Sequence, residues 1–202
     1  MHAPTTIAAL ALAIGASANY CDPDLSDLCF QERTTDQGLT LRVSIPSDPP
    51  EGFRTALQIV APIETGWVGF SWGGGMTNVP LTMAWRNGNN VTVSSRLATD
   101  YTFPDTNPDA TLTVLPGSGA KSNSTHWKAT FLCEGCTKWN YGVDVALNGS
   151  STSVPFAYAL ASEAPASPED PESAFGKHEQ TGGITFNLKE AQDARFDEVV
   201  DA

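Results

Sequence analysis

Apolar and polar residues alternate with a period of two along most of the chain. The alternation is clearest in nine segments, which Gly, Pro, Asn and Asp residues separate at short intervals. Because a strand presents successive residues to opposite faces, this pattern predicts an all-β protein, built as a sandwich or barrel. Asn87-Gly88, between two of the segments, is typical of a hairpin turn. The predicted strands are Leu39–Ile45, Thr55–Val60, Gly66–Trp72, Leu81–Trp85, Val91–Arg96, Thr111–Leu115, Trp127–Cys133, Val143–Leu147 and Val154–Leu160.

The N-terminus departs from this pattern. Residues Ile7–Ile14 form an apolar run that is too short to cross a bilayer as a helix. Ala16-Ser17-Ala18 follows with the small-x-small form of a signal-peptidase site. We therefore predict a signal peptide over residues 1–18 and a secreted, extracellular protein that begins near Asn19. The alternative is a structural N-terminal helix, since no Lys or Arg precedes the apolar run.

The C-terminal part departs from the pattern as well. Ala164–Ser173 contains three prolines among acidic residues and predicts an exposed loop or a linker. A short strand is expected at Ile184–Phe186. Asn187 with Glu190 predicts a helix start, so residues 188–202 are expected to form a short acidic helix or a frayed tail. The apolar face of that helix would consist of Leu188, Ala191, Phe196 and Val199.

Composition narrows the class of protein. Hydrophobic residues make up 41% of the 202 positions, which is enough for a packed core in a single domain. The 11 Lys and Arg are outnumbered by 23 Asp and Glu, and the net charge is −12. This acidity argues against nucleic acid and favours cations or basic proteins as partners. No later segment is long and apolar enough for a membrane anchor, and we expect a monomer.

Sequons and cysteines agree with secretion. Asn90, Asn123 and Asn148 each begin an Asn-x-Ser/Thr triplet and are candidate glycosylation sites. The four cysteines are even in number, as expected for disulfides in an oxidising compartment. Among the three connectivities that are open, pairing of neighbours along the chain is favoured: Cys21 with Cys29, and Cys133 with Cys136.

Few side chains offer chemistry. The sequence has no nucleophile elbow, no phosphate-binding loop and no His and Cys residues at zinc spacing. Its carboxylates lie mainly in turns, so a glycosidase with paired carboxyls is poorly supported. After signal cleavage two histidines remain. His126 shares a strand face with Lys128 and Thr130 that is predicted to meet solvent, and His178 lies in a loop.

Two methionines also remain after signal cleavage. Met83 lies in the middle of a predicted strand and is interpreted as core. Met76 follows Gly73–Gly75, where the backbone can approach a large flat group closely, and its thioether is a candidate soft metal ligand. From the residues alone, a flexible loop whose methionine packs on Trp72 is the simpler interpretation.

The stretch Gly66–Asn78, with its Trp-Gly-Gly-Gly-Met centre, resembles the haem-binding cytochrome domain of fungal cellobiose dehydrogenases. That module is also described as an iron reductase and belongs to the wider DOMON-like group. The resemblance implies an immunoglobulin-like β-sandwich over residues 19–187, with one non-covalent haem b in a pocket at one edge. It continues in order through most of the mature chain, in the blocks 84–89, 96–101, 123–128, 133–140 and 175–178.

The same resemblance implies roles for individual residues. The family's axial haem ligands, a Met after the glycines and a His in a late loop, fall on Met76 and His178. The tyrosine that bonds a haem propionate falls on Tyr101, and the family's disulfide falls on Cys133 and Cys136. Because Met and His fill both axial positions, no site is left for oxygen, and the implied chemistry is one-electron transfer.

The resemblance also implies partners. A flavin-dependent dehydrogenase would donate the electron, and a copper polysaccharide monooxygenase, ferric iron or a quinone would accept it. No Gly-x-Gly-x-x-Gly follows a strand, so we expect a stand-alone cytochrome with no dehydrogenase site of its own. Cys21 and Cys29 are not features we associate with the dehydrogenase-linked module, and they indicate a separate branch.

The alternative hypothesis belongs to a different class of function. On the same sandwich, a haem-free carbohydrate-binding module would need an exposed platform of aromatic side chains. The residues available for such a platform are Trp67, Trp72, Trp85, Trp127 and Tyr101.

Overall fold

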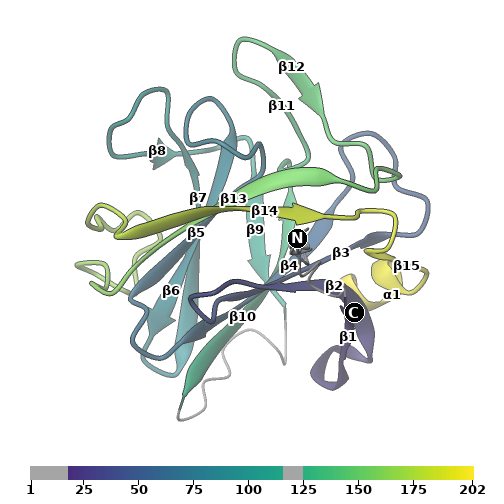
Figure 1. Ribbon diagram of the computed structural model, residues 1–202, viewed down its shortest axis with the longest axis horizontal. Helices are drawn as coiled ribbons and strands as arrows, with labels where there is room; N and C mark the ends of the chain where they lie inside the picture. The colour runs from purple at the N-terminus through teal and green to yellow at the C-terminus, as the bar shows by residue number, and fades with distance from the viewer. Residues whose placement is uncertain (1–17, 116–124) are drawn as a thin grey trace, which may run out of the picture.

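The computed structural model describes residues 18–115 and 125–202 (Figure 1). The predicted signal peptide up to residue 17 and the sequon at Asn123 lie outside the described residues. The other two sequon asparagines, Asn90 and Asn148, are exposed. Within the described ranges, no helix is long and apolar enough to cross a membrane.

Two largely antiparallel sheets form a β-sandwich, which confirms the predicted all-β fold (Figure 1). The strands of the first sheet run in the order β1-β2-β3-β4-β10-β9, and β15 pairs with β3. The second sheet has the order β14-β13-β5-β6-β7-β8, and a separate hairpin is made by β11 and β12. The first sheet consists of β1 (Ala18–Asp22), β2 (Leu28–Thr34), β3 (Thr40–Pro46), β4 (Thr55–Pro62), β9 (Thr111–Val114), β10 (His126–Glu134) and β15 (Gln192–Asp193). The second consists of β5 (Trp67–Ser71), β6 (Pro80–Asn87), β7 (Asn90–Leu97), β8 (Asp105–Thr106), β13 (Val154–Ala161) and β14 (Gln180–Phe186), with β11 at Lys138–Asn140 and β12 at Asp144–Ala146.

Each predicted strand overlaps an observed one. The Asn87-Gly88 turn joins β6 and β7 as predicted, and Gly88 has the positive φ of 60° that such a turn needs. The sequence pattern did not indicate β1 and β2, the N-terminal hairpin, because polar residues interrupt its alternation. It also did not indicate the short strands β8 and β11.

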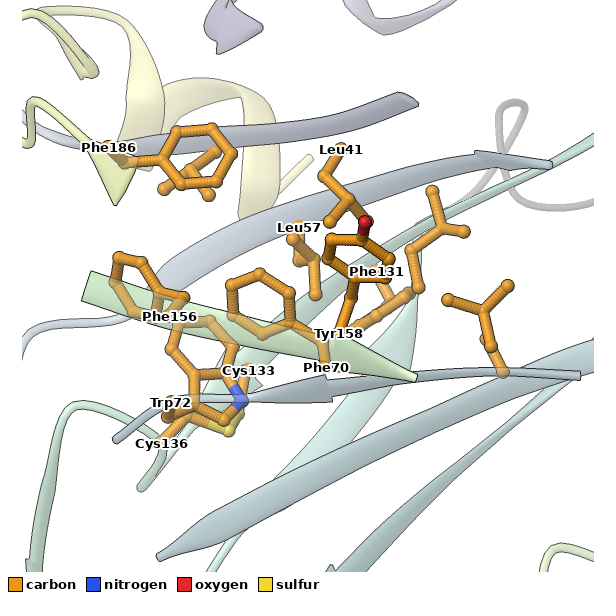
Figure 2. Packing of buried hydrophobic residues seen from close by; sticks show 14 of the residues in the cluster. Leu41, Leu57, Phe70, Trp72, Phe131, Cys133, Cys136, Phe156, Tyr158 and Phe186 are labelled. Carbon is orange, nitrogen blue, oxygen red and sulfur yellow. A yellow bond between two sulfur atoms is a disulfide. The ribbon is translucent and has the colours of Figure 1, made fainter. Parts of the chain in front are cut away.

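The main core lies between the two sheets and contains the inward residues of both (Figure 2). Leu57 and Phe131 come from the first sheet, and Phe70 and Phe156 come from the second, where their rings stack with centroids 5.1 Å apart. Each is almost completely buried, which contributes about 1.5–3 kcal/mol per side chain. The Cys133–Cys136 disulfide also belongs to this core, beside Trp72 (Figure 2).

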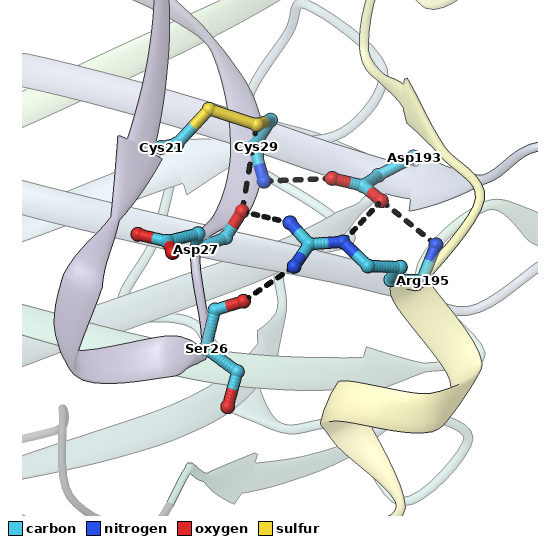
Figure 3. Close-up of a disulfide and its surroundings, with 6 residues drawn as sticks. All are labelled: Cys21, Ser26, Asp27, Cys29, Asp193 and Arg195. Atoms are coloured by element: carbon cyan, nitrogen blue, oxygen red, sulfur yellow. Dashed lines mark hydrogen bonds and ion pairs between the residues drawn. A yellow bond between two sulfur atoms is a disulfide. The ribbon is translucent and has the colours of Figure 1, made fainter.

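The chain ends close the outer face of the first sheet. A disulfide joins Cys21 and Cys29 across the N-terminal hairpin, which confirms the predicted pairing (Figure 3). Arg195 from the C-terminal segment donates to the carbonyl oxygens of Ser26 and Asp27 in that hairpin (Figure 3). Asp193 accepts a 2.8 Å hydrogen bond from the backbone N–H of Cys29. The N-terminal hairpin and the C-terminal segment therefore hold each other in place on this face.

The C-terminal helix is shorter than predicted. The only α-helix in the described ranges is α1, Phe196–Val200, and a single 3-10 turn, η1, spans Pro23–Leu25. Leu188 and Ala191, which were expected on a helix face, are buried in turns that precede β15. A helix starting at Asn187 is ruled out because β15 pairs with β3 before α1 begins.

The expected solvent face of β10 is wrong for two of its three residues. Thr130 is fully buried, and Lys128 is largely buried where its ammonium contacts Asp22 at 2.8 Å. The N-terminal hairpin, which the sequence pattern did not reveal, covers them. His126, at the beginning of the strand, is half-buried and lies 3.0 Å from the hydroxyl of Thr125.

Candidate functional site

A cavity of about 850 Å³ lies on the outer face of the second sheet. Its volume falls in the range of about 300–1,000 Å³ that is typical of small-molecule and cofactor sites. The lining comes mainly from outward-facing positions of β5, β6, β13 and β14, and from three loops that cross over them. The loop segments are 74–76, 101–104 and 175–178.

The floor of the cavity is made of small residues. Gly69 of β5, Ala157 and Ala159 of β13, and Gly183 of β14 all line it. On β5 and β13 the intervening residues are large and belong to the core between the sheets, as Phe70 and Phe156 do. Strand geometry sends neighbours to opposite faces, so this alternation of large and small residues fills the core and leaves room outside it.

A glycine-rich loop carries Met76 to the cavity. The loop begins after β5 and closes on itself where the backbone N–H of Trp72 donates to the carbonyl of Pro80 at 3.2 Å. Gly74 has a φ of 74°, and its α-carbon faces the nearby backbone of β13 at Pro155. Asn78 donates to the carbonyl of Ala98 at 2.8 Å, which ties the loop to the end of β7. These contacts hold Met76, half-buried, at the cavity wall.

His178 reaches the same cavity from the opposite end of the chain. It lies two residues before β14, and its neighbour Glu179 is fixed by two contacts. The backbone N–H of Glu179 donates to Leu160 at 2.9 Å, and its carboxylate accepts from the hydroxyl of Ser162 at 2.8 Å. Within the described part of the chain, the ring of His178 has no hydrogen-bond partner, in contrast to His126. Its imidazole nitrogens are therefore open to a ligand in the cavity.

Aromatic residues form the remaining wall and the mouth. The ring of Phe175 lies 4.9 Å from that of Trp67 and 4.8 Å from that of Phe103, measured between centroids. Tyr101 is 81% exposed although it also lines the cavity, so its hydroxyl is available at the opening. The cavity thus combines apolar walls with the exposed phenol of Tyr101, the thioether of a loop methionine and a free imidazole.

The proline-rich segment before His178 is a loop held against the sheet. The indole of Trp85 and the hydroxyl of Thr92 both donate to the carbonyl of Pro168, at 2.8 and 2.6 Å. The hydroxyl of Ser94 donates to the carbonyl of Pro171. Of the two sequence-based alternatives, the structure has the loop and not a linker.

Comparison with known proteins identifies the kind of module. The family model described as the cytochrome domain of cellobiose dehydrogenase matches residues 20–198. The chain belongs to this family. A pyrroloquinoline quinone-dependent pyranose dehydrogenase from Coprinopsis cinerea is 33% identical over 138 residues, which is 67% of this chain and 18% of that protein. This cytochrome domain therefore spans less than a fifth of the length of the curated relatives that it matches.

Two solved structures share the fold. The cytochrome b domain of the pyranose dehydrogenase from Coprinopsis cinerea superposes with a TM-score of 0.80 at 25% identity. The cytochrome domain of Myriococcum thermophilum cellobiose dehydrogenase superposes with a TM-score of 0.82 at 27% identity. Each comparison covers 92% of this chain and 95% of the other. The family resemblance inferred from sequence blocks is thereby confirmed.

Membership of a cytochrome family implies haem binding, and the residues of this cavity fit a haem. A β-carbon added to Gly69 would lie 3.0 Å from Met83, so larger residues at the floor would crowd the space. The walls are mainly apolar and aromatic, as a porphyrin requires. A thioether and an imidazole, both common haem ligands, line the same cavity at Met76 and His178.

Two features of the cavity were not predicted from the sequence, and one sequence-based expectation was wrong. Met83 is buried in a hydrophobic cluster with Trp67 and Trp85, as its interpretation as core requires, but the sequence did not indicate that it also lines the cavity. The small-residue floor was missed, although the alternation of Ala with Phe, Tyr and Leu along Val154–Ala161 carries the signal. The exposed tryptophan platform is wrong because all four tryptophans proposed for it are 2% exposed or less: Trp67, Trp72, Trp85 and Trp127.

Proposed function

We propose that the domain is a secreted b-type cytochrome that holds one non-covalent haem b in the cavity of the second sheet. Met76 and His178 are the axial ligands of its iron, and Tyr101 hydrogen-bonds a propionate at the cavity mouth. Non-covalent binding is supported by the chemistry of Cys133 and Cys136, which are joined in a disulfide within the core and do not line the cavity.

One observation carries the proposal: the half-buried Met76 and the unpartnered His178 line the same apolar cavity. They come from loops that lie about 100 residues apart in sequence, and each loop is fixed by backbone hydrogen bonds on both sides. Preorganised ligands of this kind lose little freedom on binding a metal group. Met83 also offers a thioether, but it packs closely over Gly69 and beside Trp67.

When bound, the haem would supply one-electron redox chemistry, and the protein residues would set its reduction potential and its access to water. The thioether of Met76 favours the ferrous state and raises the reduction potential above that of a site with His alone. The apolar floor and the ring of Phe175 would limit the access of water to a group bound in the cavity. With Met76 and His178 both bound to its iron, the haem would have no position left for oxygen and would supply one-electron transfer.

The electron donor proposed for this domain is a sugar-oxidising dehydrogenase. A flavin-dependent enzyme is one class, and the name of the matched relative adds a second, a pyrroloquinoline quinone-dependent pyranose dehydrogenase. A copper polysaccharide monooxygenase, ferric iron or a quinone would accept the electron. Because the net charge is −12, reduction of a basic acceptor should slow as ionic strength rises.

Matched pairs of variants test the ligand assignment. We would load haem into the purified protein and record oxidised and dithionite-reduced visible spectra, with and without carbon monoxide. The wild type and Met83→Leu should show sharp low-spin bands that carbon monoxide does not change. Met76→Leu should open one axial position, so its reduced form should bind carbon monoxide. His178→Ala should retain haem at least about tenfold less tightly than His126→Ala.

Each alternative outcome has a defined meaning. A wild-type protein that takes up no haem would refute the cytochrome function. Carbon monoxide binding to Met83→Leu but not to Met76→Leu would exchange the two methionines. Unchanged haem retention in His178→Ala would remove the histidine from the proposal.

A further inference from the structure

Arg96 of β7 is a buried cation next to the cavity but outside its lining. The side chain is 2% exposed, and four of its contacts are hydrogen bonds to uncharged oxygens. Its Nε donates to the hydroxyl of Ser94 at 2.7 Å, and its Nη1 donates to the carbonyl of Pro104 at 3.2 Å. Its Nη2 donates to the carbonyls of Pro171 at 2.8 Å and Ser173 at 3.0 Å.

These contacts join two of the three loops that cover the cavity. Pro104 ends the segment that contains Tyr101, and Ser173 lies five residues before His178. A single guanidinium therefore holds both loops to β7. The planar fork of arginine can reach carbonyls in several directions at once, which a lysine ammonium on its flexible stem does less well.

The charge of Arg96 lies behind an aromatic wall. Its guanidinium carbon is 5.4 Å from the ring centroid of Phe103 and 5.5 Å from that of Phe175, and both rings line the cavity. Among the described residues, no carboxylate lies within ion-pair distance of it, although Glu172 and Asp170 are near enough to raise its pKa. Burial has the larger effect and lowers the pKa of Arg96 below its ordinary value.

We propose that Arg96 is a positioning residue that fixes the cavity wall bearing His178 and places a permanent positive charge behind it. Two of its hydrogen bonds end on backbone carbonyls of the segment that precedes His178, at Pro171 and Ser173, so their loss would free that segment. A third ends on Pro104 of the loop that contains Tyr101. A buried cation also favours the reduced form of a nearby redox group, because reduction removes one positive charge there. Only this second effect rests on the proposed haem function.

Hydrogen–deuterium exchange of the haem-free protein tests the positioning role. In Arg96→Gln, the amides of residues 166–178 should exchange about tenfold faster or more, since hydrogen bonds from a charged donor are lost. The matched control is Arg86→Gln, which removes the same charge from an exposed position on the adjacent strand. Unchanged exchange in a folded Arg96→Gln protein would overturn the proposal.

Weaker variants guard against a failure to fold. Thr92→Val removes one donor to the same segment and leaves every hydrogen bond of Arg96 in place. Ser94→Ala removes one donor to the segment and also the acceptor of the Arg96 Nε. Each should accelerate exchange at 166–178 by a smaller factor, about threefold to tenfold, and leave β3 and β4 protected. If neither variant changes exchange in this segment, the hydrogen bonds do not restrain it and the proposal fails.

The haem-loaded protein tests the charge. The midpoint potential of Arg96→Gln should be lower than that of the wild type, and Arg96→Lys should recover it while exchange at 166–178 stays faster than in the wild type. An unchanged potential in Arg96→Gln would refute the electrostatic effect. If the wild type binds no haem, the function proposed above fails, whereas the exchange experiment still decides whether Arg96 positions the wall.

Discussion

Other segments of the chain cover the outer faces of both sheets, but side chains fill the space beneath the cover only on the first sheet. On the first sheet, the chain ends supply the cover, and Phe196 of α1 packs into a cluster with Phe30, Ala56 and Leu132. On the second sheet, loops supply the cover, and a cavity of about 850 Å³ remains above the small residues of β5, β13 and β14. The size of the outward side chains therefore decides where a sandwich is closely packed and where it keeps space for a cofactor.

The largest expected effect lies on the closed face. Phe196 is fully buried, so Phe196→Ala should lower the free energy of unfolding by about 3–5 kcal/mol, through lost burial and an unfilled space. Phe175→Ala on the cavity face should lower it less, because that ring is partly exposed before a cofactor binds. Urea denaturation of the haem-free proteins measures both. Equal losses would mean that the cavity wall is packed as closely as the closed face.

The next largest effect on stability is expected when a phenylalanine replaces a buried alanine. Ala56→Phe should lower the free energy of unfolding by about 1–3 kcal/mol, because Ala56 is fully buried against Phe196. Ala159→Phe places the same ring on the cavity floor, where it should change stability by less than about 0.5 kcal/mol and block haem uptake. Denaturation and haem titration of the two variants separate the faces. Haem uptake by Ala159→Phe equal to that of the wild type would place the haem elsewhere.

A pH profile reports on the polar part of the closed face. Burial alone raises the pKa of Asp22, but hydrogen bonds from Lys128 and Gln58 outweigh it, so its pKa lies below the ordinary 3.8. A carboxyl whose pKa is lowered by folding stabilises the fold above its unfolded pKa, and that stability is lost as pH falls through the folded value. Asp22→Asn should therefore be less stable than the wild type at pH 7.

The measurement is a series of denaturation curves from pH 7 to pH 2. The difference between Asp22→Asn and the wild type should shrink below about pH 4, where Asp22 of the wild type begins to take up its proton. Asp36→Asn, at an exposed position, is the control and should follow the wild type throughout. A difference that stays constant down to pH 2 would show that shape and not charge is lost in Asp22→Asn.

The same contrast explains what the sequence could predict. Strand positions were predictable where buried residues alternate, as along Val154–Leu160, because period-two burial follows directly from the sequence. Met76 and His178 drew attention because methionine and histidine are scarce here, and the family resemblance gave them roles. Both were then found on one cavity, which sequence distance alone cannot establish.

Contacts between distant segments account for what the sequence did not reveal. The burial of Lys128 and Thr130 depends on the N-terminal hairpin, whose strands show weak alternation. The role of Arg96 depends on carbonyls about 75 residues away, and backbone acceptors leave no signal in side-chain identity. The cavity contact of Met83 could not be predicted, because a strand with two buried faces looks the same in sequence whether the second face meets a core or a cavity.

The smallest expected effect concerns the ion pairs that tie α1 down. Arg54 donates to Asp201 at 2.6 Å and to Asp197 at 2.7 Å, next to the buried Phe196. All three charged groups are partly exposed, so solvent screens them, and Arg54→Gln should lower the free energy of unfolding by less than about 1 kcal/mol. In denaturation curves this small loss should shrink further at about 1 M salt, where the Debye length falls to about 3 Å. A loss as large as that of Phe196→Ala would mean that ion pairs, and not buried side chains, hold α1 on the first sheet. The difference between the two faces would then not follow from the size of their outward side chains.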